Sequence, residues 1–439
     1  MDDSTIVQRI REAELRSWSI PFAYAATAII LGLTLPRLEA RFFPGESSGM
    51  SPAAAMAIYS SIASGMMTLT GIVFSLQFVM VQFSATAYSP RLVLWMARDP
   101  LLLHTFGIFT ATFLYAISAL AWVDRLTSAK VPFLSGWLVM GLLLASVGAF
   151  VRLVQSVSRL QINNVLAFTG QFARQIIDVM YPPLEAPFVA KSTEFRYLSI
   201  TQSLIYSGPP RTIQSLEVAT LVSLAERADG VLEMLSAVGD TLVESTPLLR
   251  VYGAHQAIDE RDLRSAIRIG QGRTFRQDPK YSIHLLADIA IRALSPAIND
   301  PTTAVQALDQ IEDLLLRLGR RRLEIGEVRD PAGYLRLVLR VPRWEDFLDL
   351  AFSQIRSYGA SSIQVMRRMN ALLNDLIDAL PAERRPALER QQKRLDRTIV
   401  ASFPDLEDQL EAFVEDREGL GAPRKQRLEN RSEKVKSEV

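Results

Sequence analysis

Four long segments with almost no charge are the feature that most constrains how this chain folds. They cover residues 18–36, 53–83, 101–123 and 132–154, and their only acidic or basic side chains are those of His104 and Arg152. A helix that crosses a bilayer needs about 20 mostly apolar residues, whereas soluble helices of that length rarely lack charge. The sequence therefore predicts an α-helical membrane domain over residues 17–158, with about four transmembrane helices.

The basic residues beside these segments predict the orientation of the chain. One set of flanks carries Arg9, Arg11, Arg16, Arg91, Arg98, Arg152 and Arg159, and the opposite loops carry Arg37, Arg41, Arg125 and Lys130. Cytoplasmic loops are the richer in Lys and Arg, so both termini are expected in the cytoplasm, with residues 1–16 as a cytoplasmic N-terminal segment. We expect a multi-pass membrane protein whose mixed-charge start is not a cleavable signal peptide.

The second segment differs from a plain membrane anchor. As a helix it would be ~46 Å long, more than the ~30 Å of the hydrocarbon core, so it must tilt, break or protrude. Small and polar residues recur along one of its faces, at Ser61, Ser64, Thr68, Gly71, Ser75 and Gln82. Small residues let membrane helices approach closely, so this stripe predicts either a packing seam or the lining of a hydrated pore.

The chain beyond the membrane domain is predicted to be a mainly helical α/β cytoplasmic domain. Residues 159–183 are expected to extend the fourth helix as far as Pro182 and Pro183, which end it. Residues 191–256 read as a small α/β subdomain, in which the run 238–248 resembles the hairpin of a β-hammerhead in lipoyl-like folds. No lysine occupies the hairpin tip, so we interpret it as structural rather than as a carrier module.

Residues 257–415 are predicted to form a helical subdomain with one strand near 334–341. Asp278-Pro279 and Asp300-Pro301 each read as a cap followed by a first-turn proline, so two helices are expected, joined by a six-residue turn over 295–300. Further helices are expected near 344–357, 361–379, 383–401 and 404–415. The charged tail, 416–439, is predicted to be disordered.

A candidate cytoplasmic functional motif surrounds these two helices. Its members are Arg273, Asp278, His284, Asp288, Arg292, Ser295, Asn299 and Asp300. His284, Asp288 and Arg292 are spaced four residues apart and therefore share one face of the first helix. This arrangement predicts either a solvated salt-bridged face or a site beside the turn. An anion is one ligand for the second helix's N-terminus, but the cap Asp300 competes with it and repels it.

The residue inventory excludes several kinds of chemistry. Cysteine is absent, so disulfides, thiolate metal sites and cysteine nucleophiles are excluded. The three histidines are far apart, which disfavours a transition-metal site, although a carboxylate site for Mg²⁺ or Ca²⁺ stays open. The chain has no P-loop, HExxH or GxSxG motif, so we expect no cofactor, no ATP-driven pump and no enzyme. A net charge of +1 gives no reason to expect nucleic acid as a partner.

The run from Ala293 to Ala304, ALSPAINDPTTA, resembles the signature of a bacterial family of predicted membrane proteins, domain of unknown function 2254. The stretches 272–278, 71–91 and 354–359 are also similar to that family, so the resemblance extends from the first membrane segment to about residue 415. It implies a multi-spanning bacterial inner-membrane protein with a soluble C-terminal part. It supplies no catalytic residue to transfer to this sequence.

Two functions from different classes follow from these patterns. The first is an oligomeric channel or transporter-like protein built around the second membrane helix, with the cytoplasmic domain as regulator. Membrane lipids, further copies of the chain and an ion or small solute would be its partners. The alternative is a membrane-anchored sensor or scaffold that binds a cytoplasmic partner and transports nothing. An enzyme that uses His284 and Asp288 is the third and weakest reading.

Overall fold

The computed structural model describes residues 3–42, 49–87, 100–124, 131–157, 162–185 and 194–419. The chain divides into two compact units, residues 1–161 and residues 162–439. The first unit contains helices only, and the second is mostly helical with two small sheets among its described residues.

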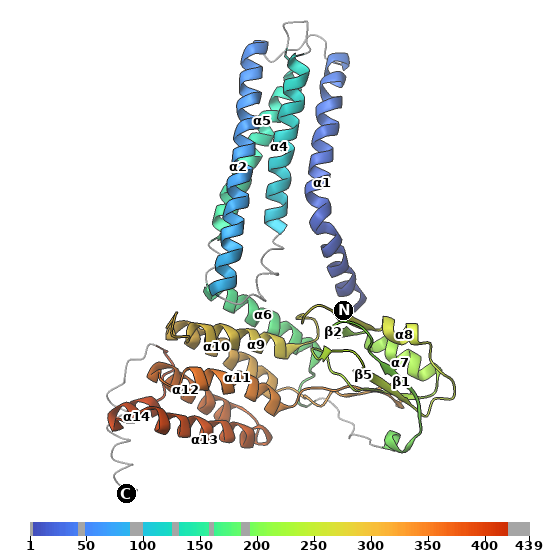
Figure 1. The fold of residues 1–439 in the computed structure, drawn as a ribbon, viewed down its shortest axis with the longest axis vertical. Helices are drawn as coiled ribbons and strands as arrows, with labels where there is room; N and C mark the ends of the chain where they lie inside the picture. Colours follow the sequence, from blue (N-terminus) through green and yellow to red (C-terminus); the bar gives the residue numbers. More distant parts are fainter. Residues whose placement is uncertain are drawn as a thin grey trace. The chain divides into compact units, whose positions relative to one another are not determined.

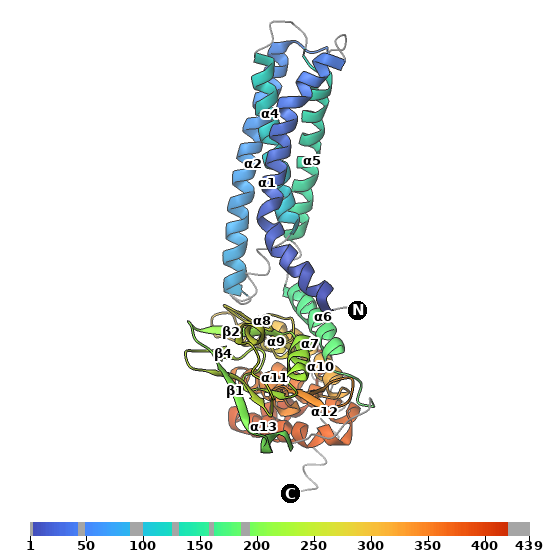
Figure 2. The same cartoon turned by 90° about the vertical axis from the view of Figure 1, so that its right-hand side faces the viewer.

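The described residues of the first unit form four long helices, which are drawn in Figures 1 and 2. They are α1 (Asp3–Phe42), α2 (Pro52–Ala87), α4 (Pro100–Asp124) and α5 (Phe133–Val157). By length and composition, all four can cross a membrane, over Ser19–Glu39, Pro52–Val79, Leu101–Val123 and Phe133–Gln155. The four predicted segments are therefore confirmed as long apolar helices.

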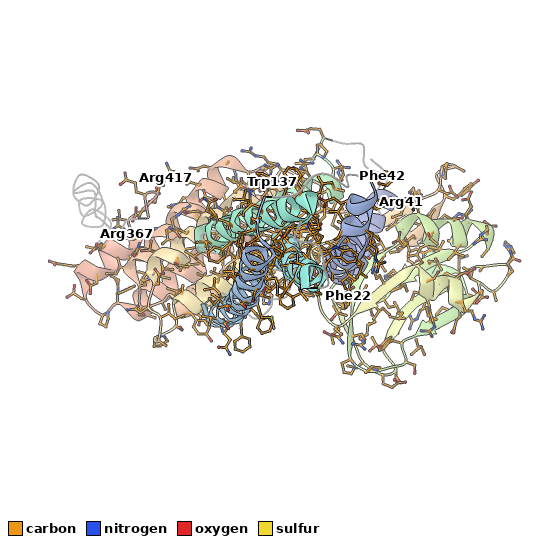
Figure 3. All side chains as sticks on the ribbon, turned by 90° about the horizontal axis from the view of Figure 1, so that it is seen from above. Phe22, Arg41, Phe42, Trp137, Arg367 and Arg417 are labelled. Atoms are coloured by element: carbon orange, nitrogen blue, oxygen red, sulfur yellow. The ribbon has the colours of Figure 1, made fainter. Side chains whose placement is uncertain are left out.

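Apolar side chains project outward from this bundle, as in a protein whose surroundings are lipid. Figure 3 shows Phe22 and Trp137 on its outer surface, and both are more than half exposed. Fully helical backbone satisfies its own polar groups, which any segment in a hydrocarbon layer requires. The exposed apolar surface and the helical backbone together fit a membrane environment.

Helix α4 forms the centre of the bundle. Phe109 and Tyr115 are fully buried, and the Thr112 hydroxyl lies 2.8 Å from the Ser146 hydroxyl of α5. A Cβ atom at Gly32 of α1 would lie 2.5 Å from Ser118 Cβ, so α1 and α4 approach closely where glycine lacks a side chain. Small residues and hydroxyl hydrogen bonds are the usual means of packing membrane helices, and here they join α1 and α5 to α4.

The second unit begins with α6 (Ile162–Met180), which packs against the helices that follow it rather than forming a separate extension. Asp313 of α10 accepts a hydrogen bond from Arg174 at 2.8 Å, and a Cβ atom at Gly170 would collide with Gln310. A helix is present from Ile162 to Met180, inside the range 159–183, but it is a separate element of the second unit, and residues 158–161 between it and the fourth membrane helix lie outside the described ones. The helix ends at Met180, just before a bend at Tyr181 and the two prolines, Pro182 and Pro183, that were expected to end it.

Two sheets follow α6. The five-stranded sheet has the order β1-β5-β3-β8-β7, with β3 and β8 parallel and the other pairs antiparallel, and the three-stranded sheet has the antiparallel order β4-β2-β6. The strands are β1 (Ile200–Ile205), β2 (Arg211–Leu216), β3 (Val231–Met234), β4 (Thr241–Leu242), β5 (Pro247–Tyr252), β6 (Ile267–Gly270), β7 (Glu327–Arg329) and β8 (Leu335–Val338). Two helices, α7 (Val218–Arg227) and α8 (Glu260–Ser265), belong to the same region. Buried Leu, Ile and Val side chains from both sheets and both helices form one core.

The remaining helices gather on the other side of this unit from the strands (Figure 1). They are α9 (Pro279–Ala293), α10 (Pro301–Gly319), α11 (Trp344–Tyr358), α12 (Ile363–Ala379), α13 (Arg385–Ser402) and α14 (Leu406–Phe413). The apolar face of α10 is fully buried, at Val305, Leu308, Ile311, Leu315 and Leu318. The expected helices of this region are confirmed to within a few residues at each end.

The sheets differ from the sequence expectation in how they are assembled. The run 238–248, which resembled a hammerhead hairpin in the sequence, does not pair with itself: its strand β4 pairs with β2, and β5 pairs with β1 and β3 in the other sheet. Strand β8 confirms the strand predicted near 334–341, whereas β6 lies in a part of the range 257–415 where no strand was predicted. Both pair with strands from the range 191–256. Each sheet therefore contains strands from both sides of the expected boundary at residue 256. An edge strand has unpaired backbone N–H and C=O groups, so it can pair with a strand from a distant part of the chain.

The prediction of a disordered tail over 416–439 is wrong for its first four residues, 416–419, which the structure describes. Asp416 accepts hydrogen bonds from the backbone N–H groups of Glu418 and Gly419, and the Gly419 carbonyl accepts one from Gln364. Residues 416–419 are therefore fixed against α12. The rest of the tail, 420–439, lies outside the described residues.

Candidate functional site

The small and polar stripe of α2 lies on the face that is turned away from the rest of the bundle. Its described members Ser61, Ser64, Thr68, Gly71, Ser75 and Gln82 are all exposed in the single chain. The face packed against the other helices is formed by Ala55, Tyr59, Ile62, Ala63, Met66 and Val73. At 100° per residue the two sets lie about half a turn apart. The stripe is therefore not the seam that holds α2 within its own subunit.

The hydroxyl groups of the stripe are partly satisfied by their own helix. Ser61 donates to the carbonyl of Ala57 at 2.8 Å, and Thr68 donates to that of Ser64 at 3.0 Å. A Cβ atom added at Gly71 would meet nothing within 4 Å. The stripe is thus a shallow, uncharged surface whose hydroxyl oxygens can still accept hydrogen bonds.

Asp278, one member of the cytoplasmic motif, joins the helices to the sheets. It caps α9 by accepting from the backbone N–H of Tyr281, and its Oδ2 lies 3.5 Å from Arg273 Nε. Arg273 in turn donates to the carbonyl of Gly239, in the turn that precedes β4. Only 2 % of the Asp278 residue is exposed, and burial raises the pKa of its carboxyl despite the nearby Arg273 and Lys280.

Tyr181, at the end of α6, reaches the same junction. Its side chain is fully buried, its hydroxyl makes no hydrogen bond, and burial together with the Asp278 carboxylate raises its pKa. The junction therefore brings together Arg273, Asp278, Gly239 and Tyr181. The last two were not expected from the sequence, because their proximity depends on how β4 and α6 pack.

The row His284, Asp288 and Arg292 is the half-buried strip of a helix whose other faces are covered. His284 Nε2 and Asp288 Oδ2 are 3.5 Å apart, an ion pair when the imidazole is protonated. The geometry fits a salt-bridged face better than a catalytic centre.

The turn between α9 and α10 uses its polar residues for capping. Ser295 donates to the carbonyl of Arg292 at 2.7 Å, and Asp300 accepts from both the backbone N–H and the hydroxyl of Thr303. Asn299 has φ +48°, a left-handed conformation that Asn tolerates better than most residues. These roles explain the order of residues in the 293–304 run, and the Asp300 carboxylate occupies the position an anion would take.

The other five predicted motif residues are divided between the two ends of α9. Arg273 and Asp278 lie at the start of α9, and Ser295, Asn299 and Asp300 lie beyond its end. Since α9 has 15 residues, the two groups are ~22 Å apart along its axis. The structure does not bring them into one site.

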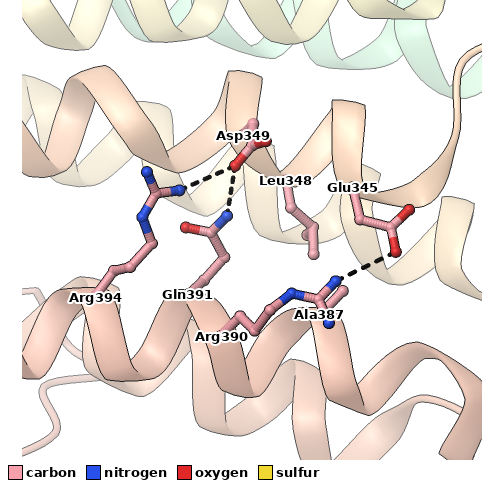
Figure 4. Close-up of a pocket in the computed structure, with 7 residues that line it drawn as sticks. All are labelled: Glu345, Leu348, Asp349, Ala387, Arg390, Gln391 and Arg394. Carbon is pink, nitrogen blue, oxygen red and sulfur yellow. Dashed lines mark hydrogen bonds and ion pairs between the residues drawn. The ribbon is translucent and has the colours of Figure 1, made fainter.

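The second unit has a surface cavity of about 300 Å³ between α11 and α13 (Figure 4). Arg390 pairs with Glu345 at 3.3 Å, and Arg394 pairs with Asp349 at 3.2 Å. The opposite charges neutralise each other, so this cavity does not concentrate charge of one sign. None of the predicted site residues lines it. Over the described parts of the chain, no group of three His, Asp or Glu side chains could hold a metal ion.

One buried acidic residue in the membrane unit was missed by the sequence reasoning. Glu39 is 5 % exposed and accepts hydrogen bonds from the backbone N–H groups of Leu134 and Ser135, which begin α5. The signal available was a single carboxylate between Arg37 and Arg41, just past an apolar segment. In the sequence, Glu39 resembles an ordinary charged loop residue, because its hydrogen-bond partner Leu134 lies 95 residues further along the chain.

Four helices able to span a membrane, joined to a mixed helical and sheet unit, define a multi-span membrane protein. The chain belongs to the predicted membrane protein family DUF2254, whose model matches residues 15–375. It is also similar to uncharacterized proteins of Mycobacterium bovis and Mycobacterium tuberculosis, at 26% identity over 389 residues that cover 86% of this chain and 73% of those proteins. No solved structure matches the chain.

Proposed function

We propose that this protein is an oligomeric channel or transporter-like protein of the bacterial inner membrane, with both termini in the cytoplasm and no enzymatic activity. In this arrangement α2 helices from several subunits face a common axis. Their stripes form a hydroxyl-lined path for an ion or small solute, and membrane lipids surround the rest.

The position of the stripe on α2 carries this proposal. Ser64, Thr68 and Ser75 are exposed on the face opposite the helix's own packing surface. Polar side chains that face lipid hydrocarbon are energetically unfavourable. A polar stripe that its own subunit leaves uncovered is therefore expected to face either another protein surface or water. Buried Phe109 and Tyr115 fill the interior of the single bundle, so a path within one subunit is disfavoured.

The second unit has the connections expected of a regulator in this proposal. Helix α6 follows α5 after only four residues and is held in the second unit by Arg174, Arg317 and Arg321. In this proposal, a change in the packing of α6 acts on the last membrane helix through this short covalent connection. The covalent connection supports coupling between ligand or partner binding outside the membrane and the state of α2.

Single cysteines test the proposed path cleanly, because the natural chain has none. Thr68→Cys and Ser75→Cys place thiols on the stripe, and Phe74→Cys places one on a neighbouring exposed position rotated by 100°. With the protein in liposomes, we expect a membrane-impermeant thiol reagent to modify the two stripe variants and block solute flux. Phe74→Cys is expected to stay unmodified and to conduct normally.

Two outcomes would reject the pore. One is the absence of any flux under all tested voltages, pH values and membrane tensions. The other is efficient disulfide crosslinking between stripe cysteines without flux, which would make the stripe a packing seam between subunits. That second result would favour the membrane-anchored sensor or scaffold.

A further inference from the structure

A cluster of buried oxygen atoms lies inside one end of the membrane bundle. At this end α1 and α4 finish and α2 and α5 begin, so residues far apart in sequence come together. The four side chains are those of Glu39, Tyr59, Tyr115 and Ser135, one from each helix, and none is more than 5 % exposed. We call this group the Glu39 cluster.

Glu39 supplies the negative charge of the cluster. Its Oε1 accepts from Leu134 N–H at 2.9 Å, and its Oε2 accepts from Ser135 N–H at 3.3 Å. The N-terminus of α5 stabilises a carboxylate through these groups and through the helix dipole. Arg37 lies instead over the ring of Trp122, and within the described residues no basic side chain forms an ion pair with Glu39.

The three hydroxyl groups of the cluster make no hydrogen bonds that explain their burial. Tyr59 Oη, Tyr115 Oη and Ser135 Oγ each have no partner with acceptable geometry, although Tyr115 lies beside Ser135 and both tyrosines lie near Glu39. A Cβ atom at Gly136 would be 3.3 Å from Tyr59 Oη, which places that hydroxyl beside the start of α5. Buried hydroxyls without partners are costly, so three together indicate a polar occupant.

We infer that the Glu39 cluster binds a monovalent alkali cation. The carboxylate oxygens retain lone pairs beyond those used by the two N–H groups, and the three hydroxyl oxygens add further hard ligands. A single positive charge neutralises Glu39 in a low-dielectric interior, where an isolated charge is unfavourable. A divalent ion would leave excess positive charge, because the cluster contains one carboxylate only.

The inference does not depend on transport. A resident cation stabilises the bundle by tying all four membrane helices together, whichever function the protein has. Loss of cation binding and loss of solute flux are therefore separate results. The site also differs from the stripe, because Tyr59 lies on the packed face of α2.

Cation-dependent thermal unfolding of the full-length protein in detergent tests the inference. NaCl and KCl are each compared with choline chloride at constant ionic strength. Because a ligand that binds only the folded state stabilises it by mass action, we expect the unfolding temperature to rise with Na⁺ or K⁺ concentration but not with choline. Glu39→Gln is expected to weaken the apparent cation affinity by about tenfold or more.

Tyrosine variants separate a cation from an empty or water-filled cluster. Tyr59→Phe and Tyr115→Phe remove one ligand oxygen each, and both are expected to fold because they remove a hydroxyl without a partner. Both should weaken the cation response. Tyr24→Phe is the matched control, since its hydroxyl lies 3.2 Å from His104 Nδ1, outside the cluster, and it should respond like the parent.

Either of two results would overturn the inference. Equal unfolding temperatures in Na⁺, K⁺ and choline would mean that water or a proton occupies the cluster. A full cation response that persists in Glu39→Gln and in both tyrosine variants would place the bound cation elsewhere in the chain.

Discussion

At the residue scale, Asp278 combines a structural task with an unfavourable environment. It caps α9 and faces Arg273, yet it is almost completely buried. The cap and the arginine favour its charged form, and burial favours its neutral form more strongly, so the pKa of the carboxyl is raised. Asp240 adds a smaller repulsion from the turn that holds Gly239. Such a residue makes the junction between helices and sheets sensitive to pH.

Asp278→Asn tests this sensitivity. Because the folded-state pKa is raised above the ordinary value of 3.8, the folded chain holds its proton more tightly than the unfolded chain. The contribution of protonated Asp278 to stability is therefore present at low pH and is lost as pH rises through the raised pKa. Asn keeps a cap and does not titrate. We expect the free energy of urea unfolding of the parent, relative to the variant, to fall as pH rises above about 4 and then level off. A difference that does not vary with pH would contradict the prediction.

Gly239 is the residue on which the same junction depends sterically. Its φ is +89°, and a Cβ atom there would lie 2.5 Å from Arg273 Nη2 and 2.6 Å from Asp278 Oδ2. We expect Gly239→Ala to destabilise the second unit by ~1–3 kcal/mol, measured by urea unfolding, through backbone strain and displacement of Arg273. Gly272→Ala is the matched control, since nothing lies within 4 Å of its Cβ position, and it should be close to neutral. Equal effects of the two substitutions would show that the contact is unimportant.

At the scale of elements, α6 is held to α10 by a small network of charges. Asp178 pairs with Arg317 at 2.9 Å and with Arg321 at 2.6 Å, and Arg321 also donates to the carbonyl of Tyr181. Arg322 donates to the carbonyl of Leu184, beyond the two prolines. Arg321 and Arg322, which follow α10 directly, therefore bind the segment that follows α6 and do not form a solvated helix end.

Asp178→Ala should loosen α6 without unfolding the unit. Its carboxylate is partly exposed, so we expect a loss of about 1 kcal/mol, at the upper end for surface pairs because two arginines share it. Hydrogen exchange of the α6 amides should speed up, while that of the sheets stays unchanged. Glu260→Ala, which removes an exposed pair with Arg264 at 3.6 Å, is the control and should change neither. Unchanged exchange in α6 would mean that apolar packing alone holds this helix.

At the scale of the whole molecule, the second unit has its own cores. Its sheets enclose one apolar cluster, and α6 buries Leu166, Ala173 and Ile177 against the helices that follow. A domain with a separate buried core is expected to fold independently of the membrane unit.

Two truncations test this independence. The fragment 162–439 should be soluble, with the helical and sheet content of the full chain by circular dichroism and a cooperative thermal transition. The fragment 194–439 lacks α6 and exposes the apolar surface that α6 covers, so it should aggregate or unfold at a lower temperature. Equal behaviour of the two fragments would show that α6 belongs functionally with the membrane helices instead.

Local patterns predicted much of this fold. Charge-free length predicted the membrane helices, because a bilayer admits few alternatives for such a segment. Asp-Pro pairs predicted where α9 and α10 begin, because capping and the proline ring act over one helical turn. The candidate site was less predictable. The stripe was visible as a pattern, but for the motif around α9 the sequence left a salt-bridged face and a site beside the turn both open, and the structure spreads its residues along that helix and beyond both of its ends.

Hydrophobic length and helix caps are local properties, so the residues alone predict a membrane protein with four long apolar helices and a large second unit. Three-dimensional packing was needed to show which face of α2 is left uncovered, which strands pair across residue 256, and that Glu39 reaches α5. Each of these depends on contacts between residues far apart in the chain, and no local pattern encodes the partner of a buried carboxylate.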